Sequence, residues 1–483
     1  MPTDFSQYLY EAYLSPLPKK MLVIILTILF IFIVNHFLHL DQIILKWAQK
    51  KSRKPLFFIF VAALVIRITW CLVSPTAFPR NYDTNLSRTE SSLISVYAVQ
   101  ISHEGIPLRP DGSLSTRRPV GYPYLLGLLY RVFGYHDQFF KFLQVIMDSA
   151  LIFIFFLLGK SFFGSAPVGI LCALLVAVYP TNWSSVNIVL DEFPFFICWF
   201  FSIYLVSENI RKRKFRSTIW IGVLLGLASA FRTPALYSPF IFLIAYWVAK
   251  MSFWKSLKQM VLVFILIYVV NIPWALITYK HFGLPCFFTT GRANYYGTLN
   301  DLATWHNGYL PTISEGGHPE FLNETNPVKR SQIGVRLAAQ WVAKNPGKTL
   351  RLIVMRNLAM YGFDLRDQLL DLNVLYATGT HSAAVILSHP LRKLKGWSYA
   401  YIVVFGVLGF LIMLFRKNHF FWKHYPSISV LVFIFLYWTA VHGFFFGYRK
   451  YRWTMELIFL FPSAFFLWKL LSARYFSRKA LTK

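Results

Sequence analysis

Apolar runs of about 20 residues recur along the whole chain, and they limit its fold more than any other feature. Twelve runs fall near 21–38, 55–75, 119–134, 138–158, 165–182, 186–206, 217–233, 235–250, 257–277, 397–416, 426–446 and 453–473. A bilayer's hydrocarbon core is about 30 Å thick, and only helices or closed barrels satisfy their backbone hydrogen bonds inside it. Charged residues make up 14% of the chain, against about 25% in soluble domains. We therefore predict an all-α polytopic membrane protein.

The charge balance is strongly basic, with 49 Lys plus Arg against 20 Asp plus Glu and a net charge of +29. In a soluble chain this balance would favour a nucleic-acid partner. Here the basic clusters lie between apolar runs, where they orient the chain with its positive loops inside and contact anionic lipid. We expect membrane lipids, and no nucleic acid, as partners.

The basic clusters also predict how often the chain crosses the membrane. The clusters that should lie inside are 46–54, 211–214, 250–258, 416–423 and 474–483. Eleven crossings satisfy this arrangement, provided that the run 119–134 is a re-entrant or outer-face helix. That run is short, begins at Pro119 and carries Arg131. The alternative is that 217–250 forms one broken span. Both readings place 76–118, 283–396 and the connection before 453 outside.

These features divide the chain into four parts. They are an N-terminal anchor with its basic loop (1–54), a transmembrane core with the first outer loop (55–282), an outer loop region (283–396) and the C-terminal helices (397–483). The first run follows two lysines and lacks a small-residue cleavage site, so we expect a retained anchor. The four cysteines are scattered without metal-ligand spacing, so we predict neither disulfides nor a zinc site.

Three cations, Arg449, Lys450 and Arg452, lie in an outer connection where the orientation rule disfavours positive charge. One explanation is contact with lipid headgroups. The other is an anionic ligand, because Arg offers a planar donor fork and Lys a point charge, which together suit a phosphate. The aromatic residues between 444 and 448 would place this site at the bilayer interface. The pattern therefore favours a lipid phosphate.

The first outer loop holds four carboxylates. Residues 88–104 have the apolar spacing of a short amphipathic helix lying on the membrane. Glu90 begins this helix, where a carboxylate is also favoured as an N-terminal charge, and Asp83 is equally consistent with a turn. We interpret Glu104 and Asp111, flanked by Gly and Pro, as solvated turns.

Further charged residues border the apolar runs. Asp191 and Glu192 are adjacent at the edge of a run, which is costly and marks a candidate site. On a helix they point about 100° apart, so we expect only one to face that site. Asp148, inside a run, is interpreted as a buried hydrogen-bond partner between helices. Arg232 lies where Pro234 breaks a helix, and it is either a snorkelling side chain or a second cation near the lipid phosphate.

Several motifs resemble the bacterial membrane glycosyltransferases of the GT-C fold, of the protein O-mannosyltransferase and aminoarabinose transferase type. The stretches that carry the resemblance include RPVGYPYLL, YPTNWSSVNIVLDEF, GLASAFRTPAL and FGYRKYRWTMELIF, in this order between about 55 and 473. Each motif alone is weak, but their shared order is fairly specific. The chain departs from the family in having Glu90 where a catalytic Asp is expected and Lys450 where Arg is usual.

The resemblance implies transfer of a sugar from a polyprenyl-phosphate donor, with inversion, to a glycan, lipid or protein at the outer face of the inner membrane. Glu90 or Asp83 would act as the base, and Glu192 would bind sugar hydroxyls or orient the acceptor. The implied substrate-binding residues are Arg118, Tyr122, Asp191, Arg232, Arg292, Asn294, Tyr295, Arg449, Lys450 and Arg452. No cofactor is implied, and the chain lacks a nucleotide-binding glycine fingerprint.

Three other functions stay open at this stage. A transporter or flippase of lipid-linked glycans would show paired charges at mid-membrane and symmetric helix breaks, but only the break at Pro234 is clear. An oligosaccharide ligase or polymerase would share the phosphate-binding cations. A scaffold without activity would tolerate loss of every acidic residue named above.

Overall fold

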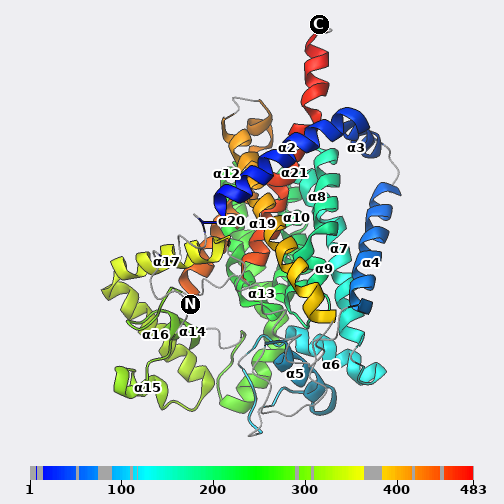
Figure 1. Cartoon of the computed structure of the whole chain (residues 1–483). Helices are drawn as coiled ribbons and strands as arrows, with labels where there is room; N and C mark the ends of the chain where they lie inside the picture. The colour runs from blue at the N-terminus through cyan, green and yellow to red at the C-terminus, as the bar shows by residue number, and fades with distance from the viewer. Residues whose placement is uncertain are drawn as a thin grey trace.

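The computed structural model describes residues 7, 13, 15–49, 54–73, 90–108, 112–116, 118–136, 138–288, 293–305, 309–363, 383–415, 419–445 and 451–481. Within these ranges the regular structure is helical, and the β pairing consists of one isolated bridge between Leu108 and Leu114. The predicted all-α class is confirmed. Figure 1 shows the helices gathered in one long bundle with a smaller helical region at its side.

Nine helical segments of the described chain are long and apolar enough to cross a membrane. They belong to α2 (Leu17–Leu38), α4 (Lys54–Val73), α7 (Gln138–Phe163), α8 with α9 (Ala166–Val178 and Pro180–Ser185), α10 (Glu192–Lys212), α13 (Phe253–Phe282), α19 (Ala383–Phe415), α20 (His419–Phe445) and α21 (Arg452–Leu481). Two shorter apolar helical segments are α11 (Thr218–Phe231) and η2 with α12 (Thr233–Tyr237 and Ser238–Val248).

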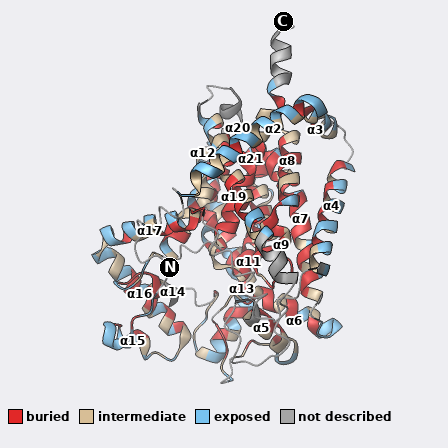
Figure 2. Cartoon of the chain, viewed as in Figure 1, coloured by how far each residue is buried: buried red, intermediate tan, exposed pale blue. Residues whose placement is uncertain are grey.

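The core of the bundle surrounds α10 and α21, because 78% of an apolar 18-residue stretch in each of them is buried, against 11% in α2. Figure 2 shows buried residues gathered in the middle of the bundle. Aromatic rings fill this core; for example, Phe155 of α7 stacks on Phe461 of α21 with 4.8 Å between ring centroids. The outer helices expose apolar faces, as expected of helices that contact lipid, because lipid tails are as apolar as these side chains. Helices α10 and α21 therefore form the rigid support for residues at their ends.

The two ends of the bundle can be told apart by their contacts. We call the end where α10 and α21 begin the site end, and the end where α10 finishes, at Arg211–Lys214, the basic end. Arg232, after α11, contacts the start of α10, whereas Arg213 donates to the carbonyl of Ala249, after α12, at 2.8 Å. Helices α11 and α12 thus make two antiparallel passes. The alternative of one broken span over 217–250 is wrong.

The break between these passes lies where the sequence predicted it. Helix α11 ends at Phe231, and Arg232 is extended, with φ −147° and ψ 123°. Pro234 then lies in the first turn of η2, where a proline is tolerated because its missing N–H is not needed there. This geometry turns the Arg232 side chain toward α10.

Helices α5 (Glu90–Glu104) and α6 (Gly121–Phe133) pack together, and Figure 1 places them at the end of the bundle opposite α3 (Leu40–Gln49) and the C-terminus. A Cβ on Gly127 of α6 would lie 2.9 Å from the Ala98 carbonyl of α5, so this glycine permits the close approach. Helix α5 confirms the helix predicted over 88–104. Helix α6, with 13 residues, spans about 20 Å, and its position outside the hydrocarbon core stays a prediction.

The described part of 283–396 before α19 forms the region at the side of the bundle (Figure 1). Its elements are α14 (Ala293–Thr298), η4 (Ile313–Glu315), α15 (Pro319–Leu322), α16 (Pro327–Lys344) and α17 (Pro346–Tyr361). Helix α17 packs against α20, and α14 packs against α16 and α20. We call these elements the side region.

Candidate functional site

The carboxylates of Asp191 and Glu192 meet one guanidinium at the site end. Arg232 donates from one NH group to Asp191 Oδ1 at 3.2 Å and forms an ion pair with Glu192 through the same nitrogen. The two acidic residues are 9% and 8% exposed. Asp191 is the N-cap residue of α10, one position before Glu192, and both carboxylates contact the same guanidinium. The expectation that only one would face the site is therefore wrong.

The surroundings of this cluster disfavour a fully charged pair. Burial, with the neighbouring Glu192 as the next cause, raises the pKa of Asp191 to about 7, while the charges of Arg232 and Arg118 oppose the rise. The guanidinium of Arg232 lies over the ring of Tyr451, 5.7 Å from its centroid. Two carboxylates, two cations and an aromatic ring thus converge near the start of α10. A site of this composition can hold a proton near neutral pH.

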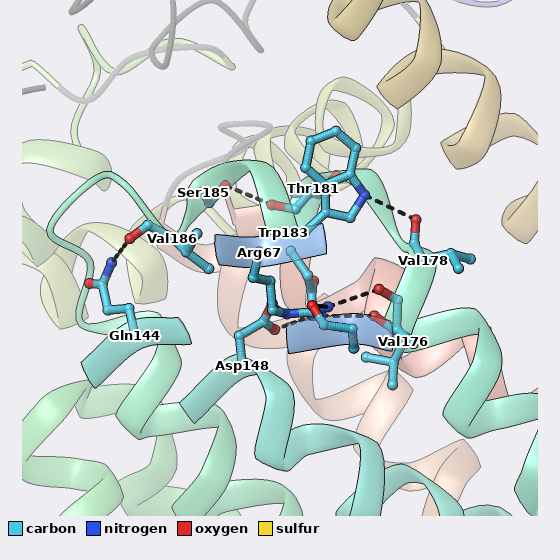
Figure 3. Close-up of polar contacts among 12 residues, drawn as sticks. Arg67, Gln144, Asp148, Val176, Val178, Thr181, Trp183, Ser185 and Val186 are labelled. Carbon is cyan, nitrogen blue, oxygen red and sulfur yellow. Dashed lines mark hydrogen bonds and ion pairs between the residues drawn. The ribbon is translucent and has the colours of Figure 1, made fainter. Parts of the chain in front are cut away.

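Gln144 of α7 fixes the segment that leads into α10. Its amide nitrogen donates to the Val186 carbonyl at 2.9 Å (Figure 3) and to the Ile188 carbonyl at 2.7 Å. Its oxygen accepts from the backbone N–H of Leu190 at 2.9 Å. The same oxygen accepts from the buried hydroxyl of Tyr122 at 2.9 Å. Tyr122, predicted to bind substrate, therefore supports the 186–190 connection in this structure. Sequence reasoning missed Gln144, because a single amide in an apolar run carries no motif.

Asp148, one turn further along α7, confirms the predicted buried partner between helices. Its carboxylate accepts from Arg67 Nε of α4 at 2.6 Å and from the Asn182 amide at 2.9 Å. Arg67 also donates to the carbonyls of Ala177 and Val176, at 2.9 and 3.3 Å, as Figure 3 shows in part. Those carbonyls lie at the end of α8, where Pro180 has no N–H to donate to the Val176 carbonyl. Arg67 thus donates to carbonyl groups that the break after α8 would otherwise leave without a partner.

Arg452 is enclosed where α21 begins. Its Nε donates to Glu456 Oε1 at 2.8 Å, an NH group donates to the Gly362 carbonyl at 2.7 Å, and the guanidinium lies 3.7 Å from the centre of the Tyr399 ring. The arginine is 1% exposed. The other carboxylate oxygen of Glu456 accepts from the Tyr179 hydroxyl at 2.6 Å. In this arrangement Arg452 fixes the start of α21, and phosphate binding by its guanidinium stays a prediction.

Several predicted site residues fall outside what the structure describes. Asp83, Arg292, Arg449 and Lys450 are outside the described residues, and the side chains of Glu90 and Asn294 are also outside them. Tyr295 is described, and its ring packs against Phe445 at the end of α20, with 4.4 Å between centroids. Tyr295 thereby lies next to the connection that carries Arg449 and Lys450 in the sequence.

In the described part of the chain, no three His, Cys, Asp or Glu side chains are grouped so that they could hold a metal ion. The chemistry of the described cluster is instead that of paired carboxylates held by guanidinium groups. Such a cluster can orient hydroxyl groups and exchange protons.

Comparison with known proteins bears on this geometry. Residues 117–274 match the family described as dolichyl-phosphate-mannose-protein mannosyltransferase. The matched third of the chain runs from the start of α6 into α13, so it includes the carboxylate pair, Gln144 and Arg232. The match confirms, for this region, the predicted resemblance to membrane glycosyltransferases of the GT-C type.

Comparison with curated proteins gives no match. Among solved structures, the archaeal oligosaccharyltransferase AglB from Archaeoglobus fulgidus, in complex with an inhibitory peptide and a dolichol-phosphate, is similar with a TM-score of 0.46 and 13% identity. The similarity covers 88% of this chain and 51% of that chain. The present chain thus spans about half the length of the solved one.

Proposed function

We propose that this protein is an integral-membrane, inverting glycosyltransferase that takes its sugar from a polyprenyl-phosphate donor. The observation that carries the proposal is the cluster of Asp191, Glu192 and Arg232 inside the region that matches the mannosyltransferase family. The acceptor is a glycan, lipid or protein with a nucleophilic group. The cluster lies at the end of α10 opposite Arg211–Lys214, so the orientation rule assigns the reaction to the outer face of the inner membrane.

The proposed reaction needs a base, a leaving-group site and a means of orientation. Asp83 or Glu90 takes the proton of the acceptor as its oxygen forms a bond to the anomeric carbon. The bond between that carbon and the phosphate oxygen breaks on the opposite face, and polyprenyl phosphate leaves. Arg449 and Lys450 stabilise the charge that develops on the phosphate.

The described residues supply the orientation. Glu192 holds sugar or acceptor hydroxyls, with Asp191 beside it to share a proton. Arg232, which already faces both carboxylates, fixes their position and supplies positive charge near the phosphate. Arg452 keeps the start of α21 in place, and Arg118, Arg292, Asn294 and Tyr295 contribute to substrate binding. This division of roles follows the contacts of each described side chain and the sequence positions of the others.

The test is a transfer assay with membranes that contain the protein and a radiolabelled polyprenyl-phosphate sugar. We expect the double variant Asp83→Ala/Glu90→Ala to lose transfer by about 100-fold or more, the usual contribution of a positioned base, and Glu192→Gln to lower turnover. Glu208→Gln is the matched control, because Glu208 lies at the basic end of the same helix and pairs with Arg211. It should transfer sugar like the wild type.

Two results would count against the proposal. Full transfer by the Asp83→Ala/Glu90→Ala variant would remove the first loop from the mechanism. Movement of the intact donor across the membrane, with no sugar released from its phosphate by any variant or by the wild type, would indicate a flippase instead.

A further inference from the structure

Arg356 of α17 joins the side region to the bundle through a buried guanidinium. One NH group donates to the carbonyl of Phe444, at the end of α20, at 2.8 Å. The other donates to the carbonyls of Thr298, at the end of α14, and Thr304, at 2.6 and 3.4 Å. The side chain is 1% exposed. Three segments that are far apart in the sequence therefore meet at one residue.

Within the described part of the chain, Arg356 donates its hydrogen bonds to carbonyl oxygens and contacts no carboxylate. Burial lowers the pKa of Arg356 to about 10, so the group stays charged at neutral pH. Burying a charge without an opposite charge is costly, which makes an incidental role a poor explanation. The guanidinium is a rigid fork, and its two NH groups donate to two different segments at the same time.

The last turn of α20 is also packed tightly against α17 at this point. A Cβ on Gly443 would lie 2.5 Å from the Asn357 amide nitrogen and 2.9 Å from a methyl group of Ile353. The glycine therefore permits the approach that brings the Phe444 carbonyl within reach of Arg356. One turn earlier on α20, the hydroxyl of Tyr361 at the end of α17 lies 2.6 Å from Thr439 Oγ1.

From the last turn of α20, described contacts lead to the carboxylate cluster. The ring of His442 stacks on that of Tyr451 with 4.6 Å between centroids, and Trp438 Nε1 donates to the Tyr451 carbonyl at 3.1 Å. Tyr451 in turn faces the guanidinium of Arg232. Arg232 binds the two carboxylates. The chain of contacts therefore runs from the side region, through α20, to the site without a gap.

We propose that Arg356 is a positioning residue for the site, whose fork holds the last turn of α20 so that Tyr451 and Arg232 face the carboxylate pair. The inference rests on the proposed function for its consequence in catalysis, while the mechanical link is a property of the fold. Because the fork and not the charge performs this task, a lysine at position 356 cannot replace the arginine. Its single ammonium group has no second arm to reach both carbonyls.

The experiment compares Arg356→Gln and Arg356→Lys with the wild-type protein in detergent micelles, by hydrogen–deuterium exchange and by the kinetics of sugar transfer. We expect faster exchange in peptides covering 441–445 and 451–456 in both variants. We also expect kcat to fall by about tenfold in both, a change of about 1.4 kcal/mol in the barrier, with the KM of the acceptor unchanged. Arg213→Gln is the matched control, because Arg213 also bridges carbonyls, at the basic end.

Three outcomes would overturn the inference. The first is faster exchange confined to α14 and α17, with 441–445 and 451–456 unchanged. The second is an Arg356→Lys variant that behaves like the wild type, which would show that charge alone is needed. The third is an equal loss of kcat in Arg213→Gln, which would indicate general destabilisation. If the wild type transfers no sugar, the proposed function fails, and the exchange pattern alone still decides whether Arg356 positions α20.

Discussion

The ion pair between Arg452 and Glu456 gives a prediction that separates a structural cation from a ligand-binding one. Both side chains are nearly inaccessible, at 1% and 3% exposure, and their nearest atoms are 2.8 Å apart. Arg452→Ala leaves Glu456 buried without its cation, and removing one partner of a buried pair costs about 3–5 kcal/mol. Loss of the contact with the Tyr399 ring adds about 1–2 kcal/mol. We therefore expect Arg452→Ala to destabilise the fold by about 4–7 kcal/mol.

The assay is reversible unfolding in mixed micelles titrated with sodium dodecyl sulfate. Glu456→Gln alone should cost about 3–5 kcal/mol, because the arginine is left without its anion. The double variant Arg452→Ala/Glu456→Gln should cost less than the sum of the two single changes, since it buries no unpaired charge and the glutamine oxygen still accepts from the Tyr179 hydroxyl. Additive losses in the three variants would refute the reasoning. So would an Arg452→Ala protein that is as stable as the wild type.

Three further predictions test other parts of the structure. Asp148→Ala should destabilise the protein by about 3–5 kcal/mol in the same unfolding assay, because Arg67 would be left buried without an anion, and an unchanged midpoint would contradict this. Burial raises the pKa of Asp191 from 3.8 to about 7, so the folded state favours the protonated carboxyl group. The stabilisation of the fold by this protonation is complete below about pH 3.8 and is lost as the pH rises through 7. The unfolding free energy of the wild type should fall across that window more steeply than that of Asp191→Asn, and parallel profiles would exclude the shift. Gly409→Ala should cost about 1–3 kcal/mol, since a Cβ there meets a backbone carbonyl of α21. Gly347→Ala, with nothing within 4 Å of the added carbon, is its control and should be neutral.

The sequence predicts the class of fold well because lipid imposes a simple rule. Runs such as 138–158 and 186–206 must be helices, and the structure places α7 and α10 there. The break at Pro234 is equally predictable, since proline removes a donor and restricts the residue before it. What the runs cannot predict is that 217–250 makes two short passes, because this depends on which neighbours each half contacts.

The site is harder to predict because its members come from distant parts of the chain. Asp191 and Glu192 stand out as adjacent carboxylates at the edge of an apolar run, and Arg232 stands out beside a helix break. That one guanidinium binds both carboxylates follows only from the packing of α10 against α11. Spacing along one helix could not reveal it.

Two further features were beyond the reach of sequence patterns. Arg452 sits in the same basic motif as Arg449 and Lys450, yet its partner Glu456 is one turn further along a helix, within an otherwise apolar run. Arg356 lies in α17, within the predicted outer loop region, and belongs to none of the motifs identified in the sequence. Its partners are backbone carbonyls, and these leave no trace in the side-chain sequence.

The most direct test of the account is the binding of a lipid phosphate at the site end. Native mass spectrometry with undecaprenyl phosphate would compare the wild type, Arg449→Ala/Lys450→Ala, and the control Arg211→Ala/Lys212→Ala, which removes the same charge at the basic end. The account predicts that the wild type and the control retain the lipid, while the site-end variant binds at least about tenfold more weakly, a loss of about 1.4 kcal/mol. Equal binding by all three proteins, or none by the wild type, would contradict it.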